Sequence, residues 1–301
     1  MGEKPGGSSL DDELGPAEDR YFGGGYRQVE HELTEADDGD GSRWRGRVTY
    51  PARWSLGPDG RSRRPHLSSV DAVVLPMAAL ATNPARWAAA APADARFWIR
   101  RVKIRAGSEP WSRLADVPVT LEMGRRSVEG QALEWCSARV GNMTVELGLA
   151  VAGMRSSAGV LAIGDLEYKS HSIASSVEAF DGASGGLRSR HLLAIGPASD
   201  PGAEQASAID FLVTMGQLAQ ALVYRTDATD RGGVENLWMR TMTIAIHGHR
   251  PIAPGAFDAV TTLDRQGGVV IDGRRLRTLR VRSLASVGVE GVADLAYFTE
   301  G

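Results

Sequence analysis

Hydrophobic and polar positions alternate along most of the chain, and two long apolar stretches interrupt the alternation. These stretches cover residues 68–82 and 206–224. An apolar run of this length between alternating segments predicts a buried helix, whereas strict alternation predicts a half-buried strand. Asn83-Pro84 ends the first predicted helix, and Pro76 within it predicts a kink.

The elements around the two helices follow the same order twice. Strands are predicted before the first helix at 28–33 and 44–50, and after it at 96–105, 117–123 and 132–150. In the second half they are predicted at 165–176, 187–195, 237–246, 268–283 and 287–298. The sequence itself also repeats, because Ser69-Val70-Asp71-Ala72 matches Ala208-Ile209-Asp210-Phe211 at an offset of 139. "FWIR" at 97–100 matches "LWMR" at 237–240 at an offset of 140.

Two matches at nearly one offset indicate a duplication. Strands, one long buried helix and further strands are typical of the hot-dog arrangement, in which an antiparallel sheet wraps around a helix. The chain is therefore predicted to have an α+β fold, a duplicated (double) hot dog. We expect a disordered tail at 1–19, a first repeat at 20–152 and a second at 153–301. Duplication is compatible with a monomer and leaves a larger assembly open.

Composition narrows the class of protein. Of the 301 residues, 43% are hydrophobic and 24% charged, which is ordinary for a globular protein, and the net charge of −3 does not favour nucleic acid or an anionic membrane. A single cysteine, Cys136, excludes an internal disulfide and suits the cytoplasm. The first 19 residues do not resemble a signal peptide, and no apolar run is long enough to span a bilayer.

Each half places an aspartate in its apolar helix and an arginine on an apolar strand face. The aspartates are Asp71 and Asp210, and the arginines are Arg100 and Arg240. A buried carboxylate must be paired, protonated or used. We expect Asp–Arg pairs, which either fix the register of the fold or face a cavity and hold a substrate carbonyl or hydroxyl. Alternatively, each aspartate only favours its helix N-terminus through the dipole.

Other candidate residues lie nearby. His66 precedes the first helix in a basic loop that includes Arg64, and an imidazole there is a candidate general base, although a solvent-facing role is the commoner one. The candidate substrate-binding residues are Arg64, Trp98, Trp238 and Gln217. His247 and His249 lack an evident third ligand, so no metal is expected.

Four segments, in order, resemble one known family. "RYFGGGYR", "RPHLSSVDA", "FWIRRVKIRAGS" and "LWMR" are similar to the avirulence protein D (AvrD) family of bacteria, and the resemblance covers nearly the whole chain after residue 18. It implies a specialised-metabolite synthase that joins a β-ketoacyl thioester to a ketose such as xylulose. The product is a syringolide or butenolide-type signal. The implied partners are an acyl carrier protein or coenzyme A thioester and a small ketose.

Such chemistry needs a base for the sugar hydroxyl and a donor for the developing oxyanion, but no cofactor. His66 is the expected base, or Asp71 or Asp210 if either is left unpaired, and Arg100 or Arg240 would steady the oxyanion. The second half has Gln205 where the first has His66, so the site is expected to be asymmetric. The alternatives are a hot-dog dehydratase or thioesterase, and a non-catalytic module that binds an acyl-lactone.

Overall fold

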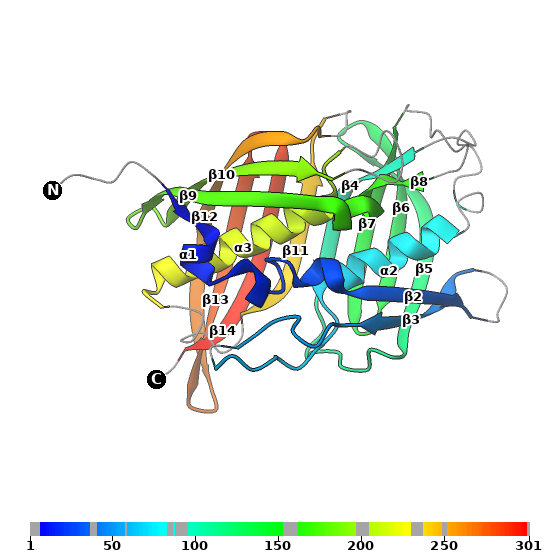
Figure 1. Cartoon of the computed structure of the whole chain (residues 1–301). Coiled ribbons are helices and arrows are strands. Elements are labelled where there is room, and N and C mark those ends of the chain that lie inside the picture. Colours follow the sequence, from blue (N-terminus) through cyan, green and yellow to red (C-terminus); the bar gives the residue numbers. More distant parts are fainter. Residues whose placement is uncertain are drawn as a thin grey trace.

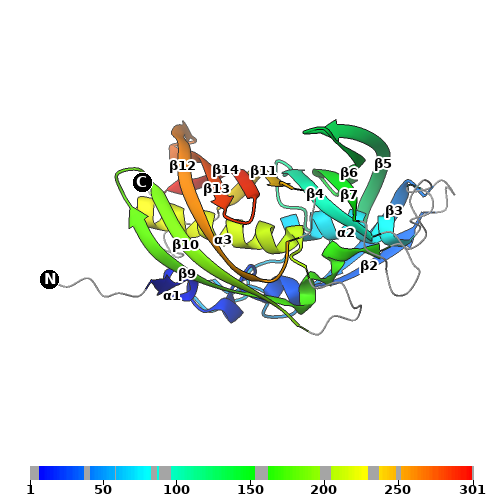
Figure 2. The ribbon, with the colours of Figure 1, turned by 90° about the horizontal axis from the view of Figure 1, so that it is seen from above.

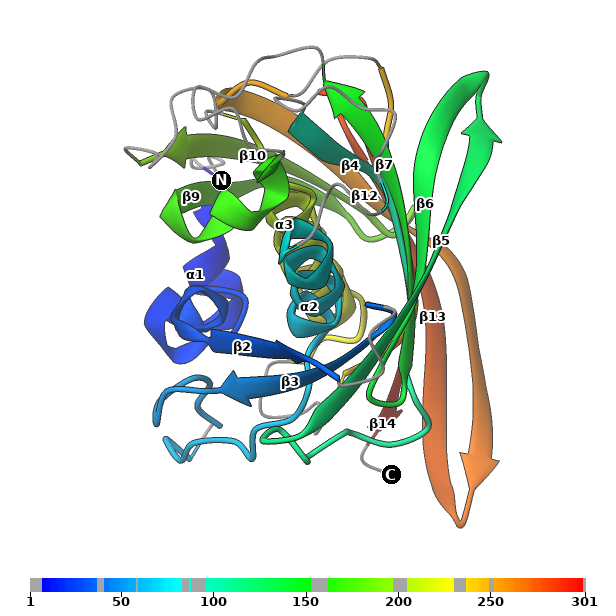
Figure 3. The ribbon, with the colours of Figure 1, turned by 90° about the vertical axis from the view of Figure 1, so that its right-hand side faces the viewer.

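One large sheet wraps around two central helices (Figure 1). The computed structural model describes residues 7–36, 41–57, 59–82, 87, 96–152, 162–196, 205–229, 237–248 and 252–299. The helices α2 (Ser69–Thr82) and α3 (Ala208–Thr226) follow one another along the sheet. Viewed along the helices, the sheet curls around them on three sides (Figure 3). The core therefore lies between the helices and the sheet.

The first half supplies α2 and six long strands of the sheet. These are β2 (Glu30–Glu35), β3 (Arg43–Thr49), β4 (Arg96–Arg105), β5 (Val117–Val128), β6 (Gln131–Val140) and β7 (Met143–Ala152). The second half supplies α3 and the matching strands. These are β9 (His171–Asp181), β10 (Gly186–Ile195), β11 (Trp238–Ile246), β12 (Gly255–Ile271), β13 (Arg274–Ala285) and β14 (Val289–Thr299).

Short elements complete the described chain. They are β1 (Ser8–Ser9), α1 (Leu10–Leu14), β8 (Ala162–Ile163) and the 3₁₀ turns η1 (Ala17–Asp19), η2 (Gly25–Gln28) and η4 (Gly164–Ser170). The prediction of a disordered tail is wrong for residues 8–19, because β1 pairs with β9 and α1 buries Leu10 and Leu14. Residues 1–6 lie outside the described chain.

The two halves meet where β11 pairs with β4, with Ala245 opposite Arg101. Outward from this seam the order is β14, β13, β12, β10, β9 on one side and β7, β6, β5, β3, β2 on the other. The order of matching strands is the same on both sides, and Figure 2 shows the halves side by side, each with its own helix. The prediction of a double hot-dog, α+β fold is confirmed.

Both helices are apolar on nearly every face because they are enclosed by the sheet. α2 continues past the interior Pro76 to Thr82. Each helix begins with a capping box, a reciprocal pair of hydrogen bonds between the cap serine and an aspartate three residues later. The pairs are Ser68 with Asp71 and Ser207 with Asp210. The position of each aspartate at a helix start is therefore fixed locally.

The predicted strand at 132–150 is two strands. Gly141, with a φ of +58°, turns the chain between β6 and β7. Likewise, the segment 165–176 begins with the turn η4 and becomes a strand only at His171. Alternation alone could not separate these elements, because the residues on both sides of each junction have similar hydrophobicity.

A β-bulge in β4 and another in β11 make the strand faces differ from those that strict alternation predicted. The register shifts between Ile99 and Arg101 in β4, and between Met239 and Thr241 in β11. Core positions are therefore odd-numbered before the bulge, as at Ile99, and even-numbered after it, as at Val102. A bulge inserts one unpaired residue and reverses the alternation. Trp98 consequently does not share the core-facing side with Val102, as strict alternation predicted.

Candidate active site

Asp71 is the centre of a buried polar network at the N-terminus of α2. Its Oδ1 lies 2.8 Å from Nε2 of His31. Its Oδ2 accepts hydrogen bonds from the amide and hydroxyl of Ser68, both at 2.8 Å, and from the Tyr50 hydroxyl. The Asp71 side chain is fully buried. The carboxylate is therefore fully engaged with donors, as a buried charge requires.

Two tyrosines enclose this network as neutral phenols. Burial, and then the charge of Asp71, raise the pKa of both Tyr21 and Tyr50 well above the usual value. The Tyr21 hydroxyl pairs with the Ser68 hydroxyl. Neutral phenols can donate hydrogen bonds and add no charge to the buried network.

His31 and Asp71 have the arrangement of a base and the group that orients it. When Nε2–H donates to Asp71, the neutral ring has its lone pair on Nδ1. The carboxylate fixes the tautomer and stabilises the imidazolium that forms when Nδ1 takes a proton. The His31 side chain keeps 6% of its surface exposed. It can therefore act as a general base at this position.

A second histidine–aspartate pair lies at the N-terminus of α3. Nδ1 of His171 lies 2.6 Å from Oδ2 of Asp210, which also accepts from the Ser207 amide at 2.8 Å. Both side chains are buried, His171 completely. Nε2 of His171 and Oδ1 of Asp210 have no hydrogen-bond partner among the described residues. The pair is thus enclosed and only partly satisfied.

The two pairs are related by the internal repeat. His31 and His171 are 140 positions apart, and the aspartates are 139 apart. The histidines were missed as site residues because they lie in the predicted strands 28–33 and 165–176, 40 and 39 positions from the aspartates in sequence. Their offset, equal to that of the "WIR" and "WMR" segments, was the available signal.

The predicted Asp–Arg pairs are wrong. Asp71 and Asp210 pair with histidines, and Arg240 is exposed, its Nη1 lying 3.4 Å from the carbonyl of Gly107. Arg100 is buried, and burial lowers its pKa, an effect that the charge of Asp165 partly opposes. The bulges explain the error, because both arginines are the extra residue of a bulge and leave the face that alternation assigned to them.

The structure does not bring His66 and Asp71 side chains together. The His66 ring is exposed, with Nδ1 3.3 Å from the carbonyl of Arg64 and its edge against Trp54. Only the His66 backbone joins the network, since its carbonyl lies 2.8 Å from the Tyr50 hydroxyl. Arg64 is exposed as well.

The remaining predicted binding residues are dispersed. Trp98 is buried, and the Arg96 guanidinium lies over its ring, 5.9 Å from the ring centroid. The repeat-related Trp238 is 39% exposed. The Gln217 side chain accepts a hydrogen bond of 2.6 Å from Arg20. Gln217 is a buried residue of α3, and this hydrogen bond satisfies its side-chain oxygen.

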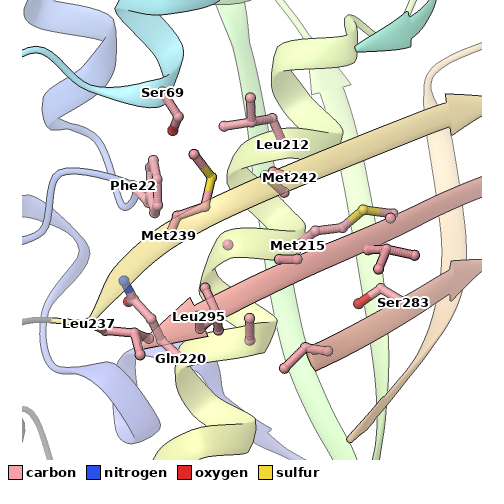
Figure 4. Close-up of a pocket in the computed structure, with 16 residues that line it drawn as sticks. Phe22, Ser69, Leu212, Met215, Gln220, Leu237, Met239, Met242, Ser283 and Leu295 are labelled. Carbon is pink, nitrogen blue, oxygen red and sulfur yellow. The ribbon is translucent and has the colours of Figure 1, made fainter. Parts of the chain in front are cut away.

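An apolar pocket lies between α3 and strands β11, β13 and β14 (Figure 4). It holds about 550 Å³ of empty space, part of it open to solvent. Methionines and leucines dominate its wall, and the polar side chains in it are Ser69, Gln220 and Ser283. No charged side chain lines it among the described residues. Such a site accepts an uncharged, flexible ligand segment.

Two residues of the pocket wall are the chain neighbours of residues in the Asp71 network. Phe22 and Ser69 line the pocket, while Tyr21 and Ser68 belong to the network. Ser69 is also the first residue of α2. The pocket wall therefore reaches the helix N-terminus, where backbone amides point outward and favour negative charge.

Within the described residues no three His, Cys, Asp or Glu side chains come close enough to hold a metal. The His247 ring lies 3.3 Å from Glu129 and 3.8 Å from Glu290, and His249 is outside the described chain. Nor is any described helix long and apolar enough to cross a membrane.

Comparison with protein families identifies the sequence. The model of the Pseudomonas avirulence D protein (AvrD) matches residues 7–171 and 194–292, which is most of the chain. The chain belongs to the AvrD family. The proposed resemblance is thus confirmed, and the His31–Asp71 and Asp210 positions all fall within the matched parts of this AvrD chain. No curated protein sequence matches it significantly.

Solved structures similar to this AvrD chain are distant in sequence. A tesB protein of Mycobacterium avium subsp. paratuberculosis is 13% identical, with a TM-score of 0.48 over 89% of this chain and 96% of that one. A hot-dog protein of unknown function from Alicyclobacillus acidocaldarius is 11% identical, with a TM-score of 0.48 over 93% and 98%. An acyl-CoA thioesterase II, TesB2, from Mycobacterium marinum is 9% identical, with a TM-score of 0.39 over 68% and 82%.

Proposed function

We propose that this AvrD-family chain joins a β-ketoacyl thioester to a ketose and so makes a syringolide or butenolide-type molecule. The observation that carries the proposal is that the apolar pocket includes Ser69, the first residue of α2, two positions before Asp71, which pairs with His31. An acyl thioester has both an apolar chain and a carbonyl that needs stabilisation as it is attacked. The pocket suits the first requirement and the helix N-terminus the second.

In the proposed reaction His31 takes the proton from a sugar hydroxyl. The hydroxyl oxygen bonds to the thioester carbonyl carbon, the carbon–sulfur bond breaks, and the thiol leaves with a proton returned by His31. Asp71 holds the imidazole and stabilises its charged form. Ring closure then removes a proton from the carbon between the two carbonyls, an already acidic position, and the same histidine can accept it. That carbon bonds to the ketone carbon of the sugar, whose oxygen takes up a proton. Loss of this hydroxyl as water, together with the second proton of the attacking carbon, gives the ring double bond of the butenolide.

The oxyanion is best met by backbone amides of α2. Within the first turn, the amides of Asp71 and Ala72 already donate to Ser68, at 3.1 Å and 3.0 Å. A helix leaves its first four amides without intrahelical acceptors, so those of Ser69 and Val70 remain for a ligand. These amides replace Arg100 and Arg240 in the role first assigned to the arginines.

The test is product analysis with the purified chain. We would incubate it with β-ketoacyl-coenzyme A and β-ketoacyl carrier-protein thioesters, with and without a panel of ketoses, and analyse the products by mass spectrometry. A sugar-dependent adduct or butenolide supports the proposal, and His31→Gln should abolish it. His247→Gln is the matched control, because His247 is a partly exposed histidine that pairs with Glu129 and not with Asp71.

Other outcomes contradict the proposal and identify the alternative. Free acid formed without a sugar indicates a thioesterase, and loss of water from a hydroxyacyl thioester indicates a dehydratase. Saturable binding of an acyl-lactone without turnover of any thioester indicates a non-catalytic binding module.

A further inference from the structure

The two halves share a fold, but the space between helix and sheet is packed with larger side chains in the first half than in the second. Matching residues can be assigned from strand pairing, because Met242 pairs with Ala293 in the second half and Val102 with Leu147 in the first. Met242 and Val102 are 140 positions apart, like the tryptophans before them. Ala293 therefore corresponds to Leu147, and two residues earlier Gly291 corresponds to Val145.

Small residues form the pocket wall of the second half. Gly291 and Ala293 on β14 and Gly216 and Ala219 on α3 all line it. Two of these are required by close packing. A Cβ on Gly216 would lie 2.8 Å from the Phe22 ring, and a Cβ on Gly291 would overlap the Met215 sulfur. The two glycines thus make room for the Phe22 and Met215 side chains, whereas Ala219 and Ala293 leave the pocket wall short.

The first half carries larger residues at the same places. At the helix offset of 139, Gly216 corresponds to Met77 and Ala219 to Leu80. Met77 and Leu147 are completely buried, and Leu80 and Val145 are 3% and 1% exposed. Because interiors are close-packed, side chains of this size occupy the volume that stays open in the second half.

We propose that the chain binds one unbranched acyl chain, in the second half only, and that Ala219 and Ala293 set the length it accepts. The acyl group lies between α3 and β14, and its carbonyl end lies near Ser69, at the start of α2. Figure 4 shows Ser69 at one end of the pocket and Gln220 toward the other. The binding site is thus a composite, with the chain held by the second half and the carbonyl by the first.

The chemistry of the wall favours an alkyl chain over other apolar ligands. Met215, Met239 and Met242 contribute flexible, polarisable side chains that adapt to a bent chain. The absence of charged groups in the described wall excludes a free carboxylate from its interior. This assignment rests on the proposed function for the identity of the thioester, but the occupancy of the pocket can be measured without turnover.

The experiment is calorimetric titration of the full chain with dodecanoate and with butyrate. We expect one dodecanoate per chain. Ala293→Leu, which copies the first half, should weaken dodecanoate binding at least about tenfold, the effect of roughly 1.4 kcal/mol, while any butyrate binding is unchanged. Ala219→Leu provides a second variant should the first fail to fold. Ala256→Leu adds the same atoms at an exposed position of β12 and is the matched control.

Two dodecanoates per chain, no dodecanoate binding, or equal affinity in the wild type and both folded pocket variants would overturn the proposal. The proposed function can fail separately. Suppose that no thioester is turned over, but that one dodecanoate binds per chain and Ala293→Leu weakens this binding. The proposed acyl site is then supported, and the proposed synthase activity is contradicted. Conversely, suppose that a sugar-dependent product forms with the same acyl chain-length preference in the wild type and in both variants. That result supports the synthase activity and contradicts this acyl site.

Discussion

His31 and His171 occupy the same position in the two halves, yet they present different ring nitrogens to their aspartates. His31 uses Nε2, at 2.8 Å from Asp71, and His171 uses Nδ1, at 2.6 Å from Asp210. The nitrogen left over is consequently Nδ1 in the first pair and Nε2 in the second. The His31 side chain is 6% exposed and the His171 side chain 0%, so only the first of these two rings keeps any solvent-exposed surface.

The first prediction is that the two histidines have different roles. His31→Gln should lower turnover by about 10²- to 10⁴-fold, the usual contribution of a general base. His171→Gln should instead lower the free energy of unfolding by about 3 kcal/mol, because Asp210 is left buried without its partner. Rates of product formation and urea denaturation of both variants distinguish the two effects.

Equal losses of turnover in both variants, with unchanged stability in both, would contradict this division. Asp116→Asn serves as the reference for an aspartate pair at the surface, because its partner Arg45 is 61% exposed. That variant should change stability by less than about 1 kcal/mol.

The second prediction concerns His66. Because its ring is exposed and bonded only to a backbone carbonyl and an aromatic edge, His66→Ala should retain most of the turnover. Its free energy of unfolding should change by no more than about 0.5 kcal/mol. Steady-state kinetics and a thermal melt are sufficient. Loss of turnover with an unchanged melt would restore His66 as the base and remove His31 from that role.

Much of the fold followed from patterns that are local in sequence. The apolar runs identified both helices, and the repeat identified the duplication, because each depends only on residue type and spacing. The Ser-x-x-Asp capping box at Ser68 and Ser207 is also a local signal, and it explains why each aspartate begins a helix. It supports the modest alternative that the aspartates favour helix N-termini.

The site depended on contacts that spacing does not encode. His31 meets Asp71 across 40 positions because β2 lies beside α2, and this pairing follows from the sheet order. The bulges at Arg100 and Arg240 were equally hidden, because one inserted residue reverses the face of every residue beyond it. Both errors therefore concern arrangement in three dimensions rather than residue chemistry.

The third prediction is an acid-sensitive contribution from His191. Burial lowers its pKa to about 4, and its ring nitrogens each lie 2.8 Å from a serine hydroxyl, those of Ser175 and Ser189. The unfolded chain takes up a proton near pH 6.5, whereas the folded chain does so only near pH 4. The stabilising contribution is therefore complete above pH 6.5 and is lost as the pH falls toward 4.

The difference of pKa corresponds to about 3 kcal/mol. His191→Gln should remove this dependence, so the wild type should lose about that much more free energy of unfolding than the variant between pH 7 and pH 4. Urea denaturation at a series of pH values measures the difference. Parallel pH curves for the two proteins would contradict the prediction.

The fourth prediction is that Asp165 contributes a pH dependence of stability opposite in direction to that of His191. Burial raises the pKa of Asp165 to about 6, although its carboxylate accepts from the amides of Ala208, at 2.6 Å, and Ile99, at 2.9 Å. Because the folded pKa lies above the usual 3.8, the contribution is complete below pH 3.8 and is lost as the pH rises through 6. Relative to Asp165→Asn, the wild type should lose about 3 kcal/mol over that window.

In the wild type this trend and that of His191 run in opposite directions over the same pH range, so they partly cancel. Only the single variants separate them, and the double variant should have the flattest stability curve of the four proteins. A variant Asp165→Asn whose pH dependence matches the wild type would show that the carboxyl group ionises normally in the folded chain. The two backbone amides would then hold the charge at the start of α3 without a net cost from burial.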